Sequence, residues 1–489
     1  MTTVATLAFV VPLGGAAASL LALRHLAIQR VIGLASSIAL VVAAAWLTVG
    51  VDAGAAVVGS GGWAPPIGIA LVADRLAALL LLTSAVALLA VLVYAVSQRQ
   101  TDEAFRGFHA VYQMLAAGVT LSLLTGDLFT LFVGFEIMLT ASYVLLTHRA
   151  TPEGTRATLT YVVIGLVASA LFLTAIAITY AVTGTVNIAD LTVRLDEVPD
   201  GLRAGLGWLL FGVFGIKAAI FPLFFWLPDS YPLAPTPVTA VFAGLLTKIG
   251  MYAIVRTQTL LFPSDGPVTI MLVIAGLTMV VGVLGAIAQK DIKRILSFHI
   301  VSQIGYMLMG LAFFTIAGVA AAIVFVVHQI VVKATLFLVG GLVEESEGTG
   351  AIDAVDGVAR RSPLIAALFL PAALSLAGFP PFSGFVGKLA LVDAGFDVEA
   401  WTIVGVSLFA SVLTLFSMTK IWGGVFWGPV RDERPRRLPG GMLGSTAMLV
   451  VVSLAIAVVA EPLLGYAERA AGDLLDPGAY RRIVLGLGS

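Results

Sequence analysis

Two lysines, Lys217 and Lys248, each stand near the middle of an apolar stretch that is long enough to cross a lipid bilayer. The segment between them contains more prolines than an uninterrupted helix would carry: Pro222, Pro228, Pro232, Pro235 and Pro237. A charged side chain at bilayer depth costs about 2.5–3.5 kcal/mol even on the most lenient insertion scale. Buried lysines beside a broken helix therefore indicate a protein that moves ions.

Three further lysines, Lys333, Lys388 and Lys420, also lie within apolar segments, whereas no arginine clearly does. The difference matters because a desolvated lysine gives up its proton readily and an arginine does not. Buried lysines can therefore alternate between charged and neutral states, as a proton path requires. Lys420 precedes Trp422 and Trp427, which are typical of a membrane interface, so we interpret it equally well as a side chain that extends to water.

An acid and a histidine accompany these lysines. Glu136 is the only acid well inside its apolar segment, and it would protonate unless a buried lysine paired with it, so we expect Lys217 to be its partner. A static structural ion pair is the alternative. His328 lies five residues before Lys333 and suits proton transfer because imidazole titrates near neutral pH, although it can also serve only as a hydrogen-bonding residue.

The composition predicts a polytopic membrane protein. Of 489 residues, 60% are hydrophobic and only 11% are charged, which is too apolar for a soluble domain. We count fourteen apolar spans, with no intervening stretch long enough for a soluble domain, and so expect a single all-α membrane domain over residues 1–489. The net charge of −1 excludes a nucleic-acid-binding protein, and the absence of cysteine excludes disulfides, iron–sulfur clusters and zinc–thiolate sites.

Two of the spans are broken by proline. Pro222 follows Lys217, and the pair Pro380–Pro381 comes about two helical turns before Lys388. Non-helical backbone at membrane depth must be buried in protein or line a wet cavity, and two such helices five spans apart indicate inverted repeats with a site between them. Prolines that only set kinks are the alternative. We predict one repeat over about 108–257 and a second over about 268–428, with flanking helices in 4–97 and 443–463.

The distribution of basic residues predicts the orientation. With the N-terminus outside, fifteen basic residues fall in inward loops: Arg24, Arg30, Arg99, Arg106, Arg149, Arg156, Lys290, Lys293, Arg294, Arg360, Arg361, Arg431, Arg434, Arg436 and Arg437. Seven fall in outward loops or the C-terminal tail: Arg75, Arg194, Arg203, Arg256, Arg469, Arg481 and Arg482. The excess predicts that both termini face outward.

Other site types have no support in the sequence. There is no GxxxxGK[ST] phosphate loop, no HExxH and no GxGxxG after a strand. His25, His109, His148 and His299 are placed at loop edges without metal-ligand spacing, so we predict no metal and no cofactor. We expect Asp229, which follows a proline, to cap a helix end at the wet boundary.

Five ordered blocks of the sequence resemble the antiporter-like subunits of respiratory complex I, a family that also includes subunits of Mrp cation/proton antiporters and of membrane-bound hydrogenases. The blocks are LFVGFEIMLTASYVLL, FGIKAAIFPLFFWLPDSYPLAPTPVTAVFAGLLTKIGMYAI, SFHIVSQIGYMLMG, VHQIVVKATLFLVGG and SLAGFPPFSGFVGKLALV. The resemblance covers roughly residues 70–430. AVTGTVNIADL and KIWGGVFWG are most similar to the D-type Mrp subunits, and the N-type complex I subunit is the nearest rival.

The resemblance implies a proton path with defined roles. Glu136 and Lys217 would be a paired switch and Lys248 the central relay, and the relay would continue through the remaining members of the row: His328, Lys333 and, as the exit, Lys388. It implies a subunit that translocates protons within a Na+ or other monovalent cation/proton antiporter of a prokaryotic plasma membrane. Its partners would be subunits of the A, B, C, E, F and G types.

Other functions remain open at this point. A proton-pumping N- or M-type subunit of an NADH:quinone oxidoreductase, or of a membrane-bound hydrogenase, would look nearly the same. The intact buried charges argue against an inert membrane scaffold. A carrier for an organic solute would need polar contacts, yet the only asparagine is Asn187, in an outer loop.

Overall fold

The chain is almost entirely helical, as the apolar spans predict. The computed structural model describes residues 1–98, 100–147, 152–429 and 438–487. In these ranges, twelve helices are long and apolar enough to cross a membrane, and two shorter apolar helices, α5 (Phe108–Leu124) and α17 (Pro363–Ala377), bring the number to the predicted fourteen. The predicted class, a polytopic all-α membrane protein, is confirmed. Several residues considered above lie outside the described ranges: Arg99, His148, Arg149, Arg431, Arg434, Arg436 and Arg437.

The elements follow the chain in four groups. The first contains α1 (Thr2–Leu21), α2 (Leu26–Gly50), the antiparallel hairpin β1 (Ala56–Gly59) and β2 (Ala70–Ala73), α3 (Arg75–Gln98) and α4 (Gln100–Ala104). The second contains α5, α6 (Leu128–Thr147), α7 (Pro152–Thr183), α8 (Ile188–Arg194), α9 (Asp200–Ala218), α10 (Trp226–Ser230), α11 (Thr236–Val241) and α12 (Thr247–Leu260). The third contains α13 (Thr269–Ala288), α14 (Ile292–Ala312), α15 (Ile316–Glu347), α16 (Val358–Arg361), α17, α18 (Ser383–Asp397) and α19 (Trp401–Ile421). The last contains α20 (Gly440–Val458), α21 (Ala460–Leu474) and α22 (Pro477–Leu485).

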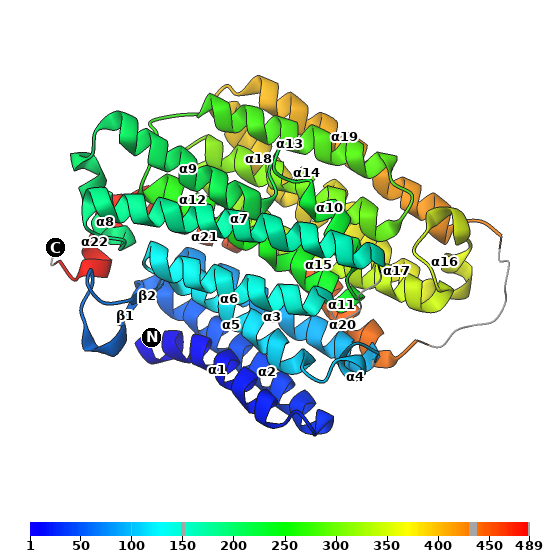
Figure 1. Ribbon diagram of the computed structural model, residues 1–489. Coiled ribbons are helices and arrows are strands. Elements are labelled where there is room, and N and C mark those ends of the chain that lie inside the picture. Colours follow the sequence, from blue (N-terminus) through cyan, green and yellow to red (C-terminus); the bar gives the residue numbers. More distant parts are fainter. Residues whose placement is uncertain (99, 148–151, 430–437, 488–489) are drawn as a thin grey trace.

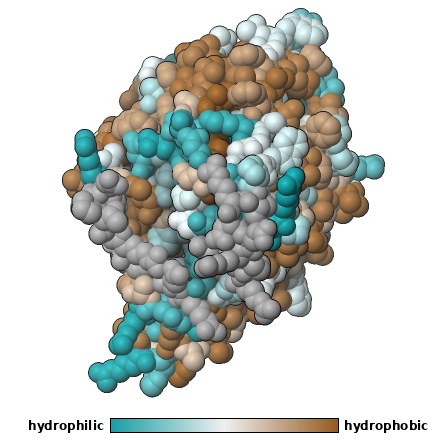
Figure 2. All heavy atoms as spheres, turned by 90° about the vertical axis from the view of Figure 1, so that its right-hand side faces the viewer, coloured by the Kyte–Doolittle hydropathy of each residue, from teal (hydrophilic) through white to brown (hydrophobic). Residues whose placement is uncertain are grey.

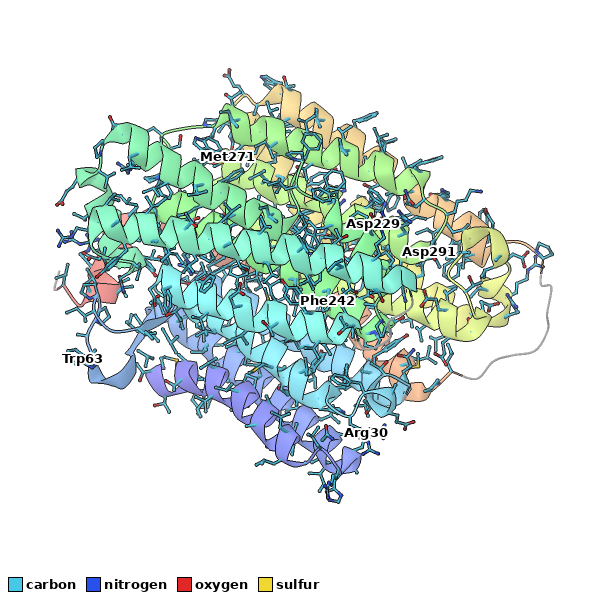
Figure 3. All side chains as sticks on the ribbon, in the orientation of Figure 1. Arg30, Trp63, Asp229, Phe242, Met271 and Asp291 are labelled. Atoms are coloured by element: carbon cyan, nitrogen blue, oxygen red, sulfur yellow. The ribbon has the colours of Figure 1, made fainter. Side chains whose placement is uncertain are left out.

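The long helices run between two opposite ends of the molecule (Figure 1). Both termini lie at the same end, on the left of that view. Figure 3 places Trp63 at this end and Arg30, Asp229 and Asp291 toward the other. The two termini therefore share one side, as an even number of crossings requires, and the assignment of that side to the outside of the cell stays a prediction.

Apolar residues face outward and polar residues face inward, which is the distribution that a lipid environment requires. Figure 2, which views the right-hand end of Figure 1, shows hydrophilic residues in the middle of this end and hydrophobic residues around its flanks. On the flanks, Trp46 is 61% exposed and Leu159 is 63% exposed. In the interior, Gln303, Gln329 and Lys333 are at most 1% exposed. A soluble protein would show the opposite distribution.

The second and third groups repeat one order of elements: a helical hairpin, a helix of 32 residues (α7 and α15), a broken helix and a final helix. In both groups an aspartate caps the second helix, with Asp127 accepting from the Thr130 amide at 2.6 Å and Asp291 from the Arg294 amide at 3.0 Å. Each aspartate also pairs as an isolated β-bridge with the segment after the 32-residue helix. This shared order is what the predicted repeats need, and their inverted relation stays a prediction.

The two broken helices end in the same way. Ala219 follows α9 with φ of 61°, and Gly378 follows α17 with φ of 85°, so a left-handed residue stops each helix. Pro222 and Pro381 then occupy the connections to α10 and α18, where they remove amides that a continued helix would use. The breaks therefore leave backbone carbonyls free inside the bundle.

Candidate proton path

Glu136 on α6 and Lys217 on α9 are brought together through a third residue, Ser169 on α7. The Lys217 ammonium lies 3.1 Å from the Ser169 hydroxyl oxygen and 3.2 Å from the carbonyl oxygen of Gly165. The Ser169 hydroxyl in turn donates to a Glu136 carboxylate oxygen. The predicted pair is therefore bridged by a hydroxyl rather than joined directly, and Ser169 is a site residue that the sequence alone does not reveal.

Glu136 also borders the membrane-facing side of the molecule. It lines an open groove of about 420 Å³ between α1, α5 and α6, whose other walls are mostly apolar, among them Ala16, Met114 and Val144. Lys217, by contrast, is only 7% exposed. The bridged pair thus connects an open groove on the side of the bundle with its interior.

Aromatic side chains enclose Lys217 at the break. A cavity of about 20 Å³, enough for roughly one water molecule, lies between Lys217, Phe135, Tyr161 and Trp226. The Trp226 indole N–H donates to the carbonyl of Ile216 at 3.1 Å. This bond satisfies a carbonyl at the end of α9 and keeps the break closed on that side.

Lys248 lies directly after an irregular turn. Residues 242–246 form a π-helical turn between α11 and α12, and the Lys248 ammonium donates to the Ala243 carbonyl at 2.5 Å. Lys248 is only 2% exposed. Single π-turns inside helices are frequent at functional sites, and here the turn provides a backbone acceptor for a buried cation.

Lys333 and His328 share α15 but bond to different neighbours. Lys333 lies 3.5 Å from the Leu296 carbonyl oxygen on α14, a long contact. His328 Nδ1 lies 2.9 Å from the Ser383 hydroxyl oxygen at the start of α18. Both side chains are fully buried, so the structure places them beside the other buried lysines without linking them to each other directly.

Lys388 bonds the backbone of the second break directly, whereas Lys217 bonds α7 beside the first break. The Lys388 ammonium donates to the carbonyl of Ala377, the last residue of α17, at 3.0 Å and lies 3.1 Å from the Ser411 hydroxyl oxygen. The same nitrogen stands 4.7 Å from the centre of the Tyr306 ring, a cation–π contact. Tyr306 and Ser411 are further residues that sequence reasoning missed.

Arg256 contradicts the expectation that no arginine lies inside an apolar segment. It is 2% exposed within α12, where its guanidinium binds Asp74 through an ion pair and lies 5.7 Å from the Tyr480 ring of α22. The apolar run of the sequence ends near residue 257, but α12 continues to Leu260 and the C-terminal helices cover it.

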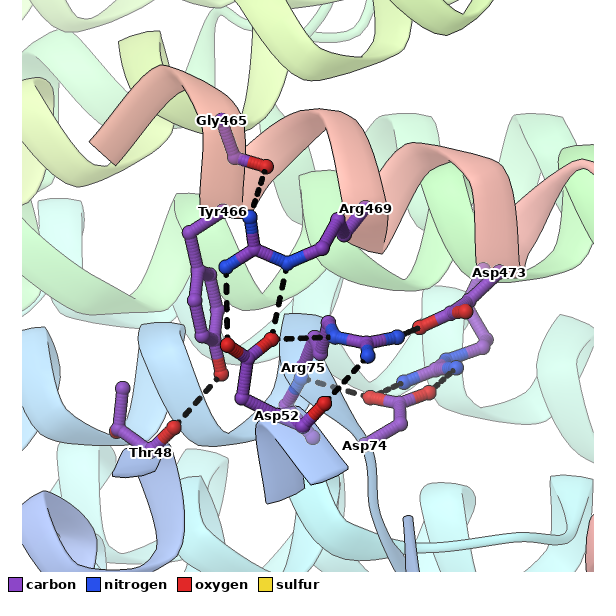
Figure 4. A network of polar contacts seen from close by, with 10 residues as sticks. Thr48, Asp52, Asp74, Arg75, Gly465, Tyr466, Arg469 and Asp473 are labelled. Atoms are coloured by element: carbon purple, nitrogen blue, oxygen red, sulfur yellow. Dashed lines mark hydrogen bonds and ion pairs between the residues drawn. The ribbon is translucent and has the colours of Figure 1, made fainter. Parts of the chain in front are cut away.

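A network of charged residues joins this region to the terminal end of the molecule (Figure 4). Arg75 bonds Asp52 at 2.8 Å and Asp473 at 2.7 Å, and Arg469 also bonds Asp52 at 3.0 Å. These contacts tie the end of α2 and the start of α3 to α21. They lie apart from the lysine row and serve to fasten the C-terminal helices.

Two histidines expected at loop edges are in fact buried. His299 lies in the middle of α14 with no exposed surface. His109 is also fully buried, with its Nε2 3.3 Å from Asp102. Burial raises the pKa of Asp102, but hydrogen bonds from His109 and Arg30 outweigh that effect and hold the pKa below its ordinary value.

Lys420 and Asp229 have structural partners. The Lys420 ammonium donates to the carbonyls of Ile287 at 2.8 Å and Gln289 at 2.5 Å, so it caps the end of α13 rather than extending freely to water. Asp229 is exposed and forms an ion pair with Arg294 at 2.9 Å. The expected helix cap at Asp229 is therefore wrong.

Comparison with known proteins identifies the family. Residues 125–414 match the transmembrane family described as NADH:quinone oxidoreductase/Mrp antiporter. The D-type Na(+)/H(+) antiporter subunit from Alkalihalophilus pseudofirmus is 41% identical over 468 residues, 94% of this chain and 95% of that protein. Its counterpart from Bacillus subtilis is 37% identical over 485 residues, 98% of each chain. A chain in the structure of the Mrp complex from Dietzia sp. DQ12-45-1b has a TM-score of 0.90 and 35% identity, covering 99% of this chain and 100% of that one. This chain belongs to the NADH:quinone oxidoreductase/Mrp antiporter family of membrane subunits, and within it to the D-type antiporter subunits.

Proposed function

We propose that this chain is the proton-translocating D-type subunit of a multi-subunit Na+/H+ antiporter in a prokaryotic plasma membrane. It is a transporter subunit rather than an enzyme. The observation that carries the proposal is the set of partners of the buried lysines. Among the described residues, they bind carbonyl and hydroxyl oxygens and no carboxylate directly: Lys217, Lys248, Lys333 and Lys388.

This bonding suits proton transfer because each lysine can be either charged or neutral with these partners. A carboxylate in direct contact would fix a buried ammonium in its charged form, whereas carbonyls and hydroxyls only orient it. At low effective dielectric, a charge that arrives on one lysine repels charge on the next. Protons can therefore move along the row as each charged lysine disfavours its neighbour's charge.

Glu136, Ser169 and Lys217 would act as the switch at one end of the row. When Lys217 is charged, the Ser169 hydroxyl accepts from it and donates to Glu136, so one hydroxyl serves both charges. When the proton leaves toward Lys248, that arrangement weakens and the carboxylate is open to a new proton. Lys388, beyond Lys333 and His328, would be the exit of the proton toward the opposite face.

Purification and reconstitution test the proposal. The complex isolated through this chain should contain the A-, B-, C-, E-, F- and G-type subunits. In vesicles it should move protons in response to a Na+ gradient, as measured with an internal pH dye. Isolation with flavin and iron–sulfur proteins, or proton movement without dependence on any monovalent cation, would instead favour a redox-driven complex.

The orientation has its own test. We propose that both termini and the segment 184–204 face outward. Because the chain has no cysteine, single introduced cysteines report access directly. An impermeant thiol reagent added to intact cells should label Asp196→Cys and leave Arg360→Cys unlabelled, and the reverse pattern would invert the orientation.

A further inference from the structure

His299 is a buried titratable group that the row described above does not use. It lies on α14 with no exposed surface, and its Nε2 is 2.9 Å from the hydroxyl oxygen of Ser417 on α19. Its Nδ1 has no partner among the described residues. Buried polar atoms are rarely left without a partner, so this nitrogen marks a place for an ordered water.

The position of His299 along α14 is between two lysines of the row. Lys333 approaches the Leu296 carbonyl, one helical turn before His299. Two turns after His299, the ring of Tyr306 lies against the ammonium of Lys388. One face of α14 therefore leads from Lys333 to Lys388, and His299 is the titratable side chain between them.

Hydroxyl groups on α19 continue this line. Ser411, Thr414 and Ser417 are three residues apart and lie toward the same side of the helix. Ser417 bonds His299, and Ser411 bonds Lys388 at 3.1 Å. Thr414 between them is fully buried. The Thr414 hydroxyl donates to the Ala410 carbonyl at 2.8 Å, so Ser417 bonds the imidazole and Ser411 bonds the last lysine, and a water has to bridge these two hydroxyls.

His328 serves a different helix. Its Nδ1 bonds Ser383 on α18, the helix that carries Lys388, whereas His299 bonds Ser417 on α19. Gln329 donates to Gln303 at 3.2 Å and joins α15 to α14 next to both histidines. The Gln303 amide nitrogen has no partner among the described residues, which again marks a polar space that water can fill.

We propose that His299 is a second proton-carrying histidine that links Lys333 to Lys388 along α14 and α19, in parallel with His328. The inference rests on the proposed function. An N–H bond of the Lys333 ammonium breaks as an Nδ1–H bond forms on His299 through a water. The Nε2–H bond then breaks as Ser417 takes this proton and gives its own hydroxyl proton to a bridging water, and Ser411 takes a proton from the water as its own O–H bond breaks toward the neutral amine of Lys388.

The test uses the whole complex in vesicles and measures proton flux driven by a Na+ gradient. The variants are His299→Gln, His328→Gln and the two combined, because glutamine keeps a hydrogen bond but carries no proton. Each single variant should slow transport, and the double variant should lose roughly a hundredfold or more, the scale of removing a positioned proton carrier. His109→Gln, an equally buried histidine away from the row, is the matched control and should transport at the wild-type rate.

Two results would overturn the inference. One is an unchanged rate when His299→Gln is added to His328→Gln, and the other is complete loss in His299→Gln alone. If the His299→Gln complex does not assemble, substitutions at Ser417 test the route instead. In the His328→Gln background, Ser417→Ala should abolish transport and Ser417→Thr should restore it. Equal rates for these two variants would also contradict the route. A wild-type complex without Na+-dependent proton flux would instead refute the proposed function.

Discussion

The two broken helices place their lysines on opposite sides of the break and give them different partners, since Lys217 lies in the last turn before the first break and Lys388 lies in the helix after the second. At the first break, Lys217 is linked to Glu136 through Ser169, close to a groove on the membrane-facing surface. At the second break, a carbonyl, a hydroxyl and the Tyr306 ring hold Lys388, and no carboxylate of the described residues bonds it. Each half therefore has a buried lysine beside a break, and the proposed roles follow from the partners: Lys217 would respond to an acid and Lys388 would release a proton.

The long helices that pack beside the two breaks also differ in how exposed they are. α7, which packs beside the first break, faces outward along much of its length, whereas its counterpart α15 is exposed only at its two ends. The first lysine is thus placed to sense events at the surface of this subunit. The second lies deep in the molecule and depends on the groups around it.

The largest expected effect comes from Lys388. Lys388→Ala removes the cation without stranding a carboxylate among its described partners, so the complex should assemble normally. We expect loss of transport by roughly a hundredfold or more, because a proton carrier is missing. Proton flux in vesicles and subunit composition after purification measure the two properties. Near-normal flux would mean that Lys388 is only a packing residue. The proposed functional difference between the lysines at the two breaks would then be contradicted.

The pair at the first break should behave as a switch rather than as a static link. If Glu136 and Lys217 were purely structural, either single change would cost roughly 3–5 kcal/mol and the double Glu136→Gln, Lys217→Met would recover folded protein. We expect the singles to assemble, since a stranded group can change its protonation, and the double to be folded but inactive. A double variant that both folds and transports would contradict the switch.

Ser169 sharpens the comparison further. Ser169→Ala removes the hydroxyl that joins Lys217 to Glu136, and a hydrogen bond to a charged group contributes about 1.5–3 kcal/mol, so transport should fall roughly ten- to a hundredfold. Ser169→Thr, which keeps the hydroxyl, is the matched control. The ratio of the two initial rates is the measurement, and a ratio near one would mean that the acid and lysine communicate without this bridge.

The smallest effect on transport is expected at Lys420. Its ammonium caps the carbonyls at the end of α13, so Lys420→Met should lower stability by roughly 1.5–3 kcal/mol and leave the rate unchanged. Thermal unfolding of the purified complex and vesicle flux separate the two outcomes. A loss of transport at unchanged stability would add Lys420 to the proton path.

The fold was largely predictable because lipid imposes simple rules on sequence. Long apolar runs must become helices, and the prolines beside the lysines must break those helices. Those rules place Lys217, Lys248 and Lys388 correctly inside the bundle. The ordered blocks around them also indicated the family, and AVTGTVNIADL and KIWGGVFWG indicated the D-type antiporter subunits.

The hydroxyl groups that bond the buried lysines could not be predicted in the same way. Serine and threonine in membrane helices often bond a carbonyl of their own helix, as Thr120 and Thr179 do here, so the sequence does not reveal which hydroxyl turns to a neighbour. Ser169 and Ser411 are the exceptions that matter. Arg256 was misplaced for a related reason, since its partner Asp74 lies 182 residues away in the chain.

The contact of Tyr480 with Arg256 bears on how this protein can be handled in the laboratory. Helix α22 packs its Tyr480 ring against the buried guanidinium that pairs with Asp74. An affinity tag that replaced or unfolded α22 would admit water, and the attraction between the two charges would weaken several-fold as the local dielectric rose. A purification handle therefore needs a flexible spacer after Leu485, and a fluorescent protein fused without one would report on a loosened molecule.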